Sequence, residues 1–351
     1  MKYLFIIQGE GMGHTTQSLA LRSMLEKNGH SVTASFLGTN ILRSKNPLYR
    51  AIAHENFFSP FFLRRGDKTG INLYTTFLFN IFLSPLYLYS IIRLAYRVRF
   101  SDADAIIVFY DIVGQLGAFF SFSGKPVYSI SHHFFFGHPA FRWPPDRRAE
   151  RTLLRIHSWL ASVGARKILA LSFTDEVHIP RKKIHVVPPL LRSEILEAIP
   201  LKGSHIHVYC MQPGFIHEVG RLAREMPHKQ FRVFLHEFED GIELPSNLHV
   251  SFISGDEFLA SLNTSESVMC TAGFETLAES VYLDKPLAVV VSSGHFEQYC
   301  NAKDALRAGA AKVLARFDDI GPGSEKNNPI CVGFKKWVDS AEGVFLKCLT
   351  E

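Results

Sequence analysis

Short apolar runs alternate with helical segments along this chain, and that alternation limits its fold more than any other feature of the sequence. Each run of about five apolar residues in the first half is long enough for one buried strand. The strands expected there are 3–7, 30–36, 105–109, 127–130, 167–171 and 183–187, with helices at 16–28 and 113–122. Strands connected through helices predict a doubly wound parallel sheet.

The pattern ends at Pro188-Pro189 and begins again after a linker at 190–204. The second half predicts strands at 205–210, 231–236, 248–252, 267–270 and 286–291, with helices at 216–225, 256–263 and 274–283. We therefore expect an α/β protein with two facing Rossmann-like domains, 1–190 and 191–332. A C-terminal helix at 333–351 follows, with packing back on the first domain as one option. Open α/β sheets bind ligands beyond the carboxyl ends of their strands, so facing domains would enclose a cleft.

Composition is typical of a globular protein from a reducing compartment. Hydrophobic residues make up 47% of the chain and charged residues 20%, which is enough for a real core. The five cysteines are scattered without a CxxC pair, which argues against a disulfide framework or a zinc ribbon. The first apolar run ends after five residues in a glycine turn, unlike a signal peptide. We expect a cytoplasmic protein, with the inner face of the membrane as one place for it.

Charge is distributed unevenly between the two halves. Residues 1–190 carry 23 Lys and Arg against 11 Asp and Glu, whereas residues 191–351 carry 15 against 22. A basic half indicates an anionic partner, such as a membrane surface, a phospholipid-like substrate or nucleic acid. Nucleic acid is the least favoured of these, because the sequence contains no recognised nucleic-acid-binding motif.

Residues 71–92 form a run of 22 residues without a charge, just long enough to cross a bilayer. Seven polar or helix-breaking residues argue against a span: Asn72, Thr75, Thr76, Asn80, Ser84, Pro85 and Ser90. Three interpretations stay open, namely helices packed on the sheet, a membrane-surface element and a true span. The arginines that flank the run suit the surface interpretation: Arg64, Arg65, Arg93, Arg97 and Arg99.

A second basic and aromatic stretch follows at 132–155. Its aromatic part, 132–143, precedes Arg147, Arg151 and Arg155, which share one face of a helix. A solvated basic face beside buried aromatic residues is an equally good interpretation.

The first strand runs into a glycine turn that contains Gly9, Gly11 and Gly13 and ends at His14. Glycines after a strand let backbone amides approach an anion, and the following helix adds its positive end. A dinucleotide fingerprint would need glycine at position 14 and an acidic residue after the second strand, and both are missing. A neutral His14 at this edge is a candidate general base, with simple capping or packing as the alternative.

The second half contains a longer motif at 268–311. A strand ends in Thr271-Ala272-Gly273, and a helix begins at Phe274, so its first-turn amides form another anion site. Glu279 lies further along that helix. A strand led by Pro286 then precedes the loop Gly294-His295-Phe296-Glu297-Gln298.

This motif resembles the donor-binding half of GT-B glycosyltransferases. The pattern is small-Gly-x-x-Thr-x-x-Glu, a Pro-led strand, an acidic residue with Gln, and Asn-Ala before Gly-Ala. It is similar to the superfamily of the bacterial N-acetylglucosaminyltransferases for lipid-linked precursors and of UDP-glucuronosyltransferase-like enzymes. The turn at 9–14, the segment 105–133 and the linker 187–192 resemble the first half of related prokaryotic transferases.

The resemblance implies an inverting, metal-independent, hexosyltransferase-type enzyme of the cell envelope or carbohydrate metabolism. It would move a sugar from a UDP-sugar to a hydroxyl of an anionic or lipid-linked acceptor, with no other cofactor. Glu279 resembles the residue that holds the ribose, Phe252-Ile253 the pair around the uracil, and Glu297-Gln298 the pair on the sugar. The donor-binding residues implied are Gly11, Gly13, Phe252, Ile253, Ala272, Gly273, Phe274, Glu275, Thr276, Glu279, Glu297 and Gln298. The catalytic residues implied are His14 and, as its orienting partner, Asp111.

Some features depart from the family or favour other functions. No DxD pair ends a strand, and His132-His133, as neighbours on an expected strand, would face opposite ways, so no metal site is predicted. Ala272 stands where a hydroxyl residue is common. A UDP-sugar epimerase of the same fold is an alternative, although its Gly-Thr-Arg-Pro-Glu opening is absent. A sugar-nucleotide-binding protein without turnover is another.

Overall fold

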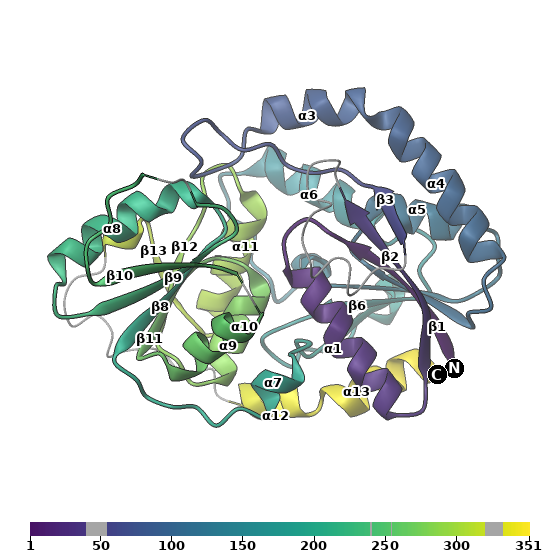
Figure 1. Ribbon diagram of the computed structural model, residues 1–351. Coiled ribbons are helices and arrows are strands. Elements are labelled where there is room, and N and C mark those ends of the chain that lie inside the picture. Colours follow the sequence, from purple (N-terminus) through teal and green to yellow (C-terminus); the bar gives the residue numbers. More distant parts are fainter. Residues whose placement is uncertain (40–54, 239–240, 254, 320–332) are drawn as a thin grey trace. The chain divides into compact units, whose positions relative to one another are not determined.

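The computed structural model describes residues 1–39, 55–238, 241–253, 255–319 and 333–351 (Figure 1). These residues divide into two compact units. The first unit comprises Met1–Phe62, Tyr74–Arg192 and Lys336–Glu351, and the second comprises Leu63–Leu73 and Ser193–Lys335. Residues 63–73, which the sequence places inside the first domain, therefore belong to the second unit.

A seven-stranded parallel sheet forms the centre of the first unit, in the order β3-β2-β1-β4-β5-β6-β7. Its strands are β1 Lys2–Gln8, β2 Ser31–Thr39, β3 Glu55–Phe58, β4 Ala105–Phe109, β5 Val127–Ser131, β6 Lys167–Leu171 and β7 Ile184–Val187. β4 and β5 are buried along their whole length, as in a parallel sheet covered on both faces. The strand order reverses between β1 and β4, which makes their carboxyl ends the natural ligand position.

Helices connect the strands of this unit, and glycines permit the close packing of one of them. The helices are α1 Gly13–Lys27, α3 Leu73–Phe82, α4 Ser84–Arg99, α5 Ile112–Phe120 and α6 Arg148–Leu160, with 3-10 helices η1 His132–Gly137 and η2 Pro180–Lys182. A Cβ on Gly114 would come within 2.3 Å of Ile6, and one on Gly117 within 2.7 Å of Leu94. α5 therefore lies against β1 on one side and α4 on the other.

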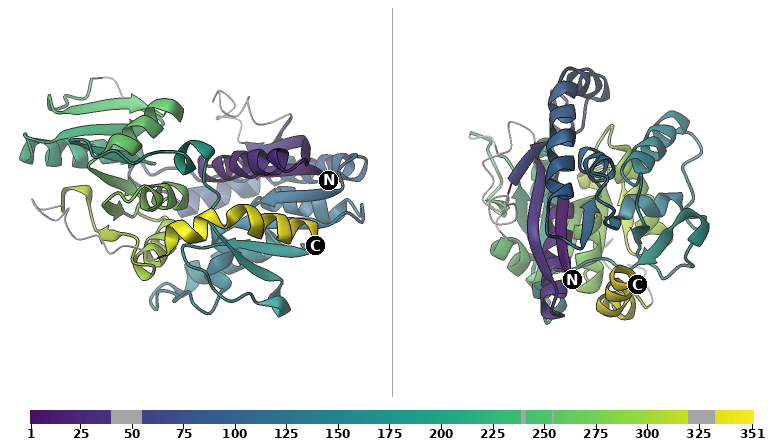
Figure 2. Two further views of the ribbon diagram at one scale, coloured as in Figure 1. Left: turned by 90° about the horizontal axis from the view of Figure 1, so that it is seen from below. Right: turned by 90° about the vertical axis from the view of Figure 1, so that its right-hand side faces the viewer.

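The C-terminal helices α12 Phe334–Asp339 and α13 Ala341–Thr350 close the chain (Figure 2, yellow). The last turn of α13 belongs to the first unit, because Tyr3 Oη and Tyr128 Oη donate to Leu349 O at 3.5 and 3.3 Å. Lys167 Nζ donates to Cys348 O at 2.9 Å. These donors satisfy carbonyls that a helix end leaves without intrahelical partners.

The second unit contains a six-stranded parallel sheet in the order β10-β9-β8-β11-β12-β13, which reverses between β8 and β11. Its strands are β8 His205–Cys210, β9 Gln230–Leu235, β10 Leu248–Phe252, β11 Ser267–Thr271, β12 Leu287–Val290 and β13 Lys312–Leu314. Its helices are α7 Ser193–Leu196, α8 Ile216–Glu225, α9 Gly255–Thr264, α10 Phe274–Tyr282 and α11 Phe296–Arg307, with η3 Pro213–Phe215 and η4 Phe317–Asp319.

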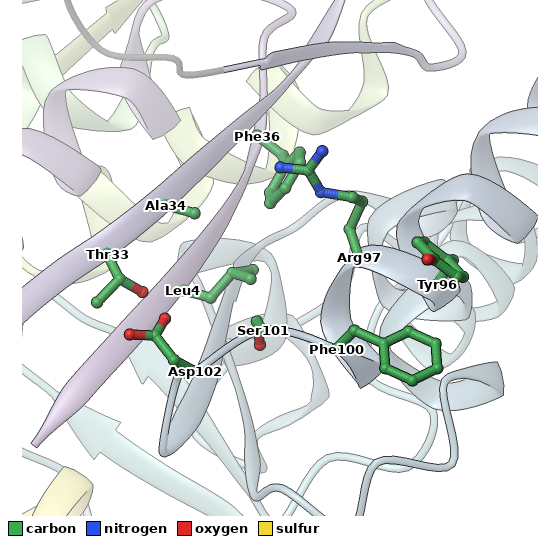
Figure 3. A pocket seen from close by; sticks show the side chains of 9 residues that line it. All are labelled: Leu4, Thr33, Ala34, Phe36, Tyr96, Arg97, Phe100, Ser101 and Asp102. Carbon is green, nitrogen blue, oxygen red and sulfur yellow. The ribbon is translucent and has the colours of Figure 1, made fainter.

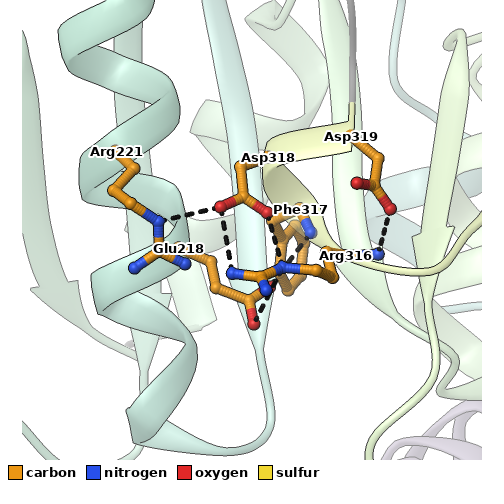
Figure 4. Close-up of polar contacts among 6 residues, drawn as sticks. All are labelled: Glu218, Arg221, Arg316, Phe317, Asp318 and Asp319. Atoms are coloured by element: carbon orange, nitrogen blue, oxygen red, sulfur yellow. Dashed lines mark hydrogen bonds and ion pairs between the residues drawn. The ribbon is translucent and has the colours of Figure 1, made fainter.

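A polar cluster ties η4 to α8 over the core of this unit (Figure 4). Asp318 pairs with Arg221 and Arg316, each through a 2.9 Å contact, and Phe317 N donates to Glu218 at 3.1 Å. Although partial burial opposes ionisation of Asp318, the hydrogen bonds from the two arginines hold the pKa of its carboxyl below the ordinary value. The cluster holds the fully buried ring of Phe317 against Phe215, with centroids 5.3 Å apart.

The two α/β units with parallel sheets confirm the expected fold class, but some local predictions were wrong. His132 and His133 begin the 3-10 helix η1 and do not lie on a strand. α1 begins at Gly13, three residues before its expected start, so His14 lies in its first turn. β3 and β13 are short strands that the apolar pattern did not predict. Cys210, Cys270, Cys300 and Cys348 are buried free thiols, whereas Cys331 lies outside the described residues.

Residues 71–92 divide into α3 and α4, which are bent by 60° at their junction. Among the described residues, no single helix is long and apolar enough to cross a membrane, although this bent pair together has the length and the apolar composition to do so. α4 buries Tyr87, Leu94 and Val98, so it packs on the unit as one interpretation expected. α3 buries only Thr76. The exposed apolar side chains are Leu73, Tyr74, Phe77, Leu78, Phe79, Ile81 and Phe82 on α3 and Leu88, Tyr89, Ile92 and Tyr96 on α4.

Candidate functional site

The turn after β1 depends on glycine at two positions. A Cβ on Gly9 would lie 2.1 Å from Gly38 O, so no side chain fits between β1 and β2 here. Gly11 has a φ of +77°, a backbone conformation that L side chains rarely adopt. The chain then enters α1 at Gly13, and His14 follows at the carboxyl edge of the sheet.

His14 lies against two aromatic rings of the first unit. Its Nδ1 is 3.2 Å from Gln17 Oε1, and its ring centroid is 5.9 Å from that of Tyr110 and 5.8 Å from that of His133. A neutral His14 that donates from Nδ1 to this amide keeps its basic lone pair on Nε2. In that tautomer Nε2 is the nitrogen that can accept a proton.

The two rings behind His14 are themselves fixed. Tyr110 and His133 stack with centroids 3.9 Å apart. Tyr110 Oη lies 2.8 Å from Ser158 Oγ, and His133 Nδ1 lies 2.6 Å from Ser131 Oγ. Tyr110 has a φ of +53°, a strained conformation for a tyrosine immediately after β4. Sequence reasoning missed Tyr110 and His133 as parts of the site, because only the fold brings them to His14.

Asp111 caps α5 and is fully buried. Its Oδ1 accepts from Gly114 N at 2.6 Å and its Oδ2 from Ser59 Oγ at 2.5 Å. Burial raises the pKa of Asp111 to about 6, although these hydrogen bonds favour its charged form. The Gly114 contact is that of a helix cap and the Ser59 contact is long-range, and the orientation of His14 by Asp111 stays a prediction.

The switch point of the second unit lies between β8 and β11. Met211 N, just after β8, donates to Thr271 Oγ1 at the end of β11 at 3.0 Å. Gly273 is the N-cap of α10 and has extended backbone geometry. The amides of Phe274, Glu275 and Thr276 in the first turn are therefore placed as an anion site.

Residues after β12 meet the same region. Gln298 is buried; its Oε1 accepts from Ser292 N at 2.9 Å, and its Nε2 lies 3.3 Å from Met211 Sδ. Asn301 Nδ2 donates to Ala272 O at 2.9 Å and so holds the turn before α10. The structure thus gathers residues 271–276 and Gln298 with Met211, which sequence reasoning had not singled out.

The remaining predicted donor residues differ in their exposure. Glu279 on α10 is only 1% exposed. Glu297 is half-buried in the first turn of α11. Phe252 ends β10 with 65% of its surface exposed, and Ile253 N donates to Leu235 O at 3.2 Å. An exposed aromatic ring at the carboxyl edge of the sheet is suited to stacking on a base.

A cavity of about 520 Å³ lies elsewhere in the first unit, where α4 ends beside β1 and β2 (Figure 3). Arg97 reaches over Phe36 in it, with 5.6 Å from the guanidinium carbon to the ring centroid. Its lining includes Leu4, Thr33 and Asp102, which belong to the amino-terminal parts of the strands or precede them. The cavity is therefore separate from the carboxyl edge that carries His14.

The described part of the chain contains no group of three or more His, Cys, Asp and Glu side chains placed to hold a metal ion. The polar groups at the two switch points are imidazole, amide and carboxyl groups together with helix N–H donors. Such groups can take a proton, bind hydroxyls and bind phosphate oxygens.

Comparison with solved structures agrees with the two-unit architecture. MurG of Acinetobacter baumannii superposes with a TM-score of 0.58 at 14% identity, covering 100% of this chain and 99% of that one. UDP-GlcNAc 2-epimerase of Neisseria meningitidis, bound to UDP-GlcNAc, superposes with a TM-score of 0.66 at 13% identity, covering 100% of both chains. UGT2 of Phytolacca americana, complexed with UDP-2-fluoro-glucose and pterostilbene, superposes with a TM-score of 0.61 at 15% identity, covering 97% of this chain and 94% of that one. Identities this low show the GT-B fold alone.

Comparison by sequence goes further. No curated protein matches this chain. The family model described as Glycosyl transferase family 1 matches residues 1–320, which is most of the chain. The strand order, the glycine turn and the Gly273 helix start all lie within the matched residues. This chain therefore belongs to Glycosyl transferase family 1 and is a glycosyltransferase with the GT-B fold.

Proposed function

We propose that this enzyme transfers a hexose from a UDP-sugar to a hydroxyl of an anionic or lipid-linked acceptor, with inversion and without a metal. The observation that carries the proposal is the convergence of the α10 N-terminus, Gln298 and Met211 at the switch point of the second unit. A positive helix end of this kind can bind the phosphates of a nucleoside diphosphate. The UDP-sugar complexes among the structural neighbours support UDP as the nucleotide.

The donor is proposed to lie along the carboxyl edge of the second sheet. Phe252 and Ile253 would hold the uracil, Glu279 the ribose, and the amides of residues 273–276 the diphosphate. Glu297 and Gln298 would accept hydrogen bonds from sugar hydroxyls. The Gln298 amide already contacts Ser292 N and Met211 Sδ, so a hydrogen bond to a sugar hydroxyl would replace one of these contacts.

His14 is proposed to act as the general base on the acceptor. It takes the hydroxyl proton on Nε2 while the acceptor oxygen bonds to the anomeric carbon. The bond from that carbon to the diphosphate oxygen breaks, and UDP leaves with the electron pair. Attack opposite the leaving group inverts the anomeric configuration, and the helix amides stabilise the charge that develops on UDP.

Turnover with nucleotide sugars tests the proposal. We would incubate the enzyme with UDP-, TDP- and GDP-sugars and a membrane lipid extract, and measure nucleotide release and the anomeric configuration of the product. UDP release that depends on acceptor, with an inverted product, is expected. Release that requires an added divalent cation and stops with EDTA would contradict metal independence.

The epimerase remains the second candidate, because a UDP-GlcNAc 2-epimerase superposes over the whole chain. The same incubation distinguishes it. An isomerised sugar nucleotide in the absence of acceptor would favour the epimerase, and nucleotide binding without any product would favour a binding protein.

We further infer that α3 and α4 contact an anionic membrane surface on the cytoplasmic side. Their exposed apolar side chains include Tyr74, Phe77 and Phe82, and neither helix contains an acidic residue. The first half of the chain is basic, which complements anionic lipid. α6 adds a second exposed amphipathic surface with Trp159, Leu153 and several arginines.

Vesicle flotation tests this inference. The double variant Phe77→Ser/Phe82→Ser should lose binding to vesicles that contain phosphatidylglycerol, while its turnover of a soluble acceptor stays unchanged. Val177→Ser removes an equally exposed apolar side chain outside α3 and α4, and is the matched control. Equal flotation of the double variant and the control would contradict the inference.

A further inference from the structure

A tight hairpin from the first half of the sequence belongs to the second unit. Arg64 and Ile71 form an antiparallel bridge. Arg65 N donates to Gly70 O at 2.9 Å, and Lys68 N donates to Arg65 O at 3.1 Å. We name residues 64–71 the clasp hairpin; in Figure 1 it precedes α3. The apolar pattern gave no sign of it, because it has neither a strand nor a helix period.

The clasp hairpin is docked on three loops at the carboxyl edge of the second sheet. After β8, Gly214 N donates to Lys68 O at 3.0 Å. After β12, Ile71 N donates to Ser293 O at 3.1 Å. After β9, Glu237 pairs with Arg64 at 2.6 Å. β8 and β12 also precede Met211 and Gln298, respectively, so the hairpin lies beside the proposed donor site.

Two of these contacts require glycine. A Cβ on Gly214 would lie 2.4 Å from Asp67 O, and one on Gly70 would lie 2.2 Å from Ser293 O. The backbones therefore meet in van der Waals contact. Such close backbone contacts indicate that the clasp hairpin has one defined position on these loops.

The clasp hairpin brings positive charge to an acidic unit. Residues 193–335 carry 12 Lys and Arg against 19 Asp and Glu, whereas residues 63–73 carry three against one. Several cations of 193–335 are already bound to carboxylates: Arg221, Lys229, Arg307, Arg316 and Lys335. A diphosphate in such surroundings needs further cations, because the carboxylates around it raise its free energy.

Of the cations in the clasp hairpin, Arg65 is the one best placed to bind the diphosphate. Its Nη1 donates to Ser293 Oγ at 2.9 Å, which fixes it on the loop that leads to Gln298. Among the described residues, the carboxylate that pairs with Arg65 is that of Asp67, 3.7 Å away, and the Arg65 side chain is 47% exposed. A guanidinium has five N–H donors, so several of them are left for phosphate oxygens.

Two buried polar atoms lie next to the docking points. In the described part of the chain, Gln212 Oε1 and Ser292 Oγ have no hydrogen-bond partner. Both residues are more than nine-tenths buried, and each is within two residues of a docking contact. Buried polar groups without a hydrogen-bond partner favour a rearrangement in which they form hydrogen bonds, as when a polar ligand binds.

We propose that Arg65 is a donor-binding residue, and that the clasp hairpin holds its guanidinium against the diphosphate of the nucleotide sugar. This proposal rests on the function proposed above. Ser293 acts as a positioning residue for Arg65. Part of the donor site therefore comes from the first half of the sequence, in a segment that the glycosyltransferase motif does not include.

Titration calorimetry with UDP tests the role of Arg65. Arg65→Gln should raise the Kd for UDP about tenfold, which is the usual effect of losing one charge-assisted hydrogen bond. Arg65→Lys should recover part of this loss, and Ser293→Ala should weaken binding about threefold. Lys312→Gln removes an equal charge at the amino end of the same sheet and should bind like wild type. Glu279→Gln serves as the second reference, because it tests the donor site itself.

The outcomes separate the two proposals. If Glu279→Gln loses UDP binding while Arg65→Gln binds like wild type, the role of Arg65 is wrong and the proposed function stands. If the wild-type enzyme binds none of UDP, TDP and GDP, both are wrong. An equal loss in Lys312→Gln and Arg65→Gln would show a general charge effect and would contradict a specific contact.

Limited proteolysis provides a readout that does not depend on activity. Trypsin should cleave the clasp hairpin after Arg65 and Lys68, and saturating UDP should slow that cleavage at least fivefold in wild type. Cleavage at Lys312 serves as the internal control and should not change. Hairpin cleavage at the same rate with and without UDP would contradict the proposal.

Discussion

Tyr110 and His133 stack nearly in parallel, with ring centroids 3.9 Å apart and planes 13° from each other, and His14 lies against both. Each of the three residues comes from a different segment of the first unit: His14 from α1, Tyr110 from the position after β4 and His133 from the start of η1. The stack therefore fixes the imidazole that is proposed to take the acceptor proton.

Loss of the stack should impair catalysis without impairing donor binding. His133→Leu frees the His14 ring to adopt other positions, and we expect kcat to fall about tenfold, because misplaced catalytic groups lose much of their effect. The Kd for UDP should not change. His138→Leu removes another imidazole of the same segment, stacked on Phe135, and is the matched control. An unchanged kcat in His133→Leu would exclude the positioning role.

Removal of the base itself should have a larger effect. His14→Ala is expected to lower kcat by about 10²- to 10⁴-fold, the usual contribution of general base catalysis. UDP should bind as tightly as in wild type. Gln17→Leu, which removes the partner of Nδ1, should shift the pH profile of kcat and lower its maximum less than His14→Ala does. A pH profile identical in Gln17→Leu and wild type would contradict this tautomer assignment.

Asp111 should make stability depend on pH. Its folded pKa of about 6 lies above the ordinary value of 3.8, so the native state holds the proton more tightly than the unfolded state. Stability from this group is therefore present below pH 4 and is lost as the pH rises to about 6, by about 3 kcal/mol in all. Urea unfolding at pH 4 and pH 7 should show this decline in wild type but not in Asp111→Asn. Parallel curves for the two proteins would contradict the shift.

The glycine turn should tolerate substitution unequally. Gly9→Ala would place a methyl group against Gly38 O, and we expect a loss of about 2 kcal/mol or more in the free energy of unfolding. Gly11→Ala meets no atom but adopts a positive φ, so about 1 kcal/mol is expected. Gly220→Ala, in open space on α8, should stabilise by about 0.5–1 kcal/mol. Thermal or urea unfolding would check this ranking, and equal losses at positions 9 and 220 would refute it.

Two phenylalanines of the second unit should separate stability from binding. Phe317→Ala opens a cavity beneath the η4 cluster and should cost about 3–5 kcal/mol of unfolding free energy. Phe252→Ala, at an exposed ring, should change stability by less than about 0.5 kcal/mol but weaken UDP binding. Unfolding and calorimetry on the same preparations provide the comparison. A large loss of stability in Phe252→Ala would show that its ring packs and does not serve a ligand.

Local patterning by itself determined most of the architecture. β4 and β5 are continuous apolar runs because both faces of a parallel sheet are buried, and that pattern is legible in sequence. The Gly273 helix start and the glycine turn also follow from backbone requirements that only certain residues meet. These features, with the motif around Glu279 and Gln298, were enough to predict the fold class and the family.

Only the tertiary structure decided those features of the site and the surface that depend on contacts between residues far apart in sequence. The stack of Tyr110 on His133 joins residues 23 positions apart in sequence. Ser59, which contacts Asp111, follows β3, a strand that no apolar period marks. Residues 71–92 read as one apolar run, yet α4 packs and α3 stays exposed, because burial depends on what the fold places opposite each face. The clasp hairpin docks through backbone atoms and glycines, whose contacts leave no periodic trace. Sequence periodicity encodes which face of an element is apolar, whereas the partner of that face is chosen only when the whole chain is packed.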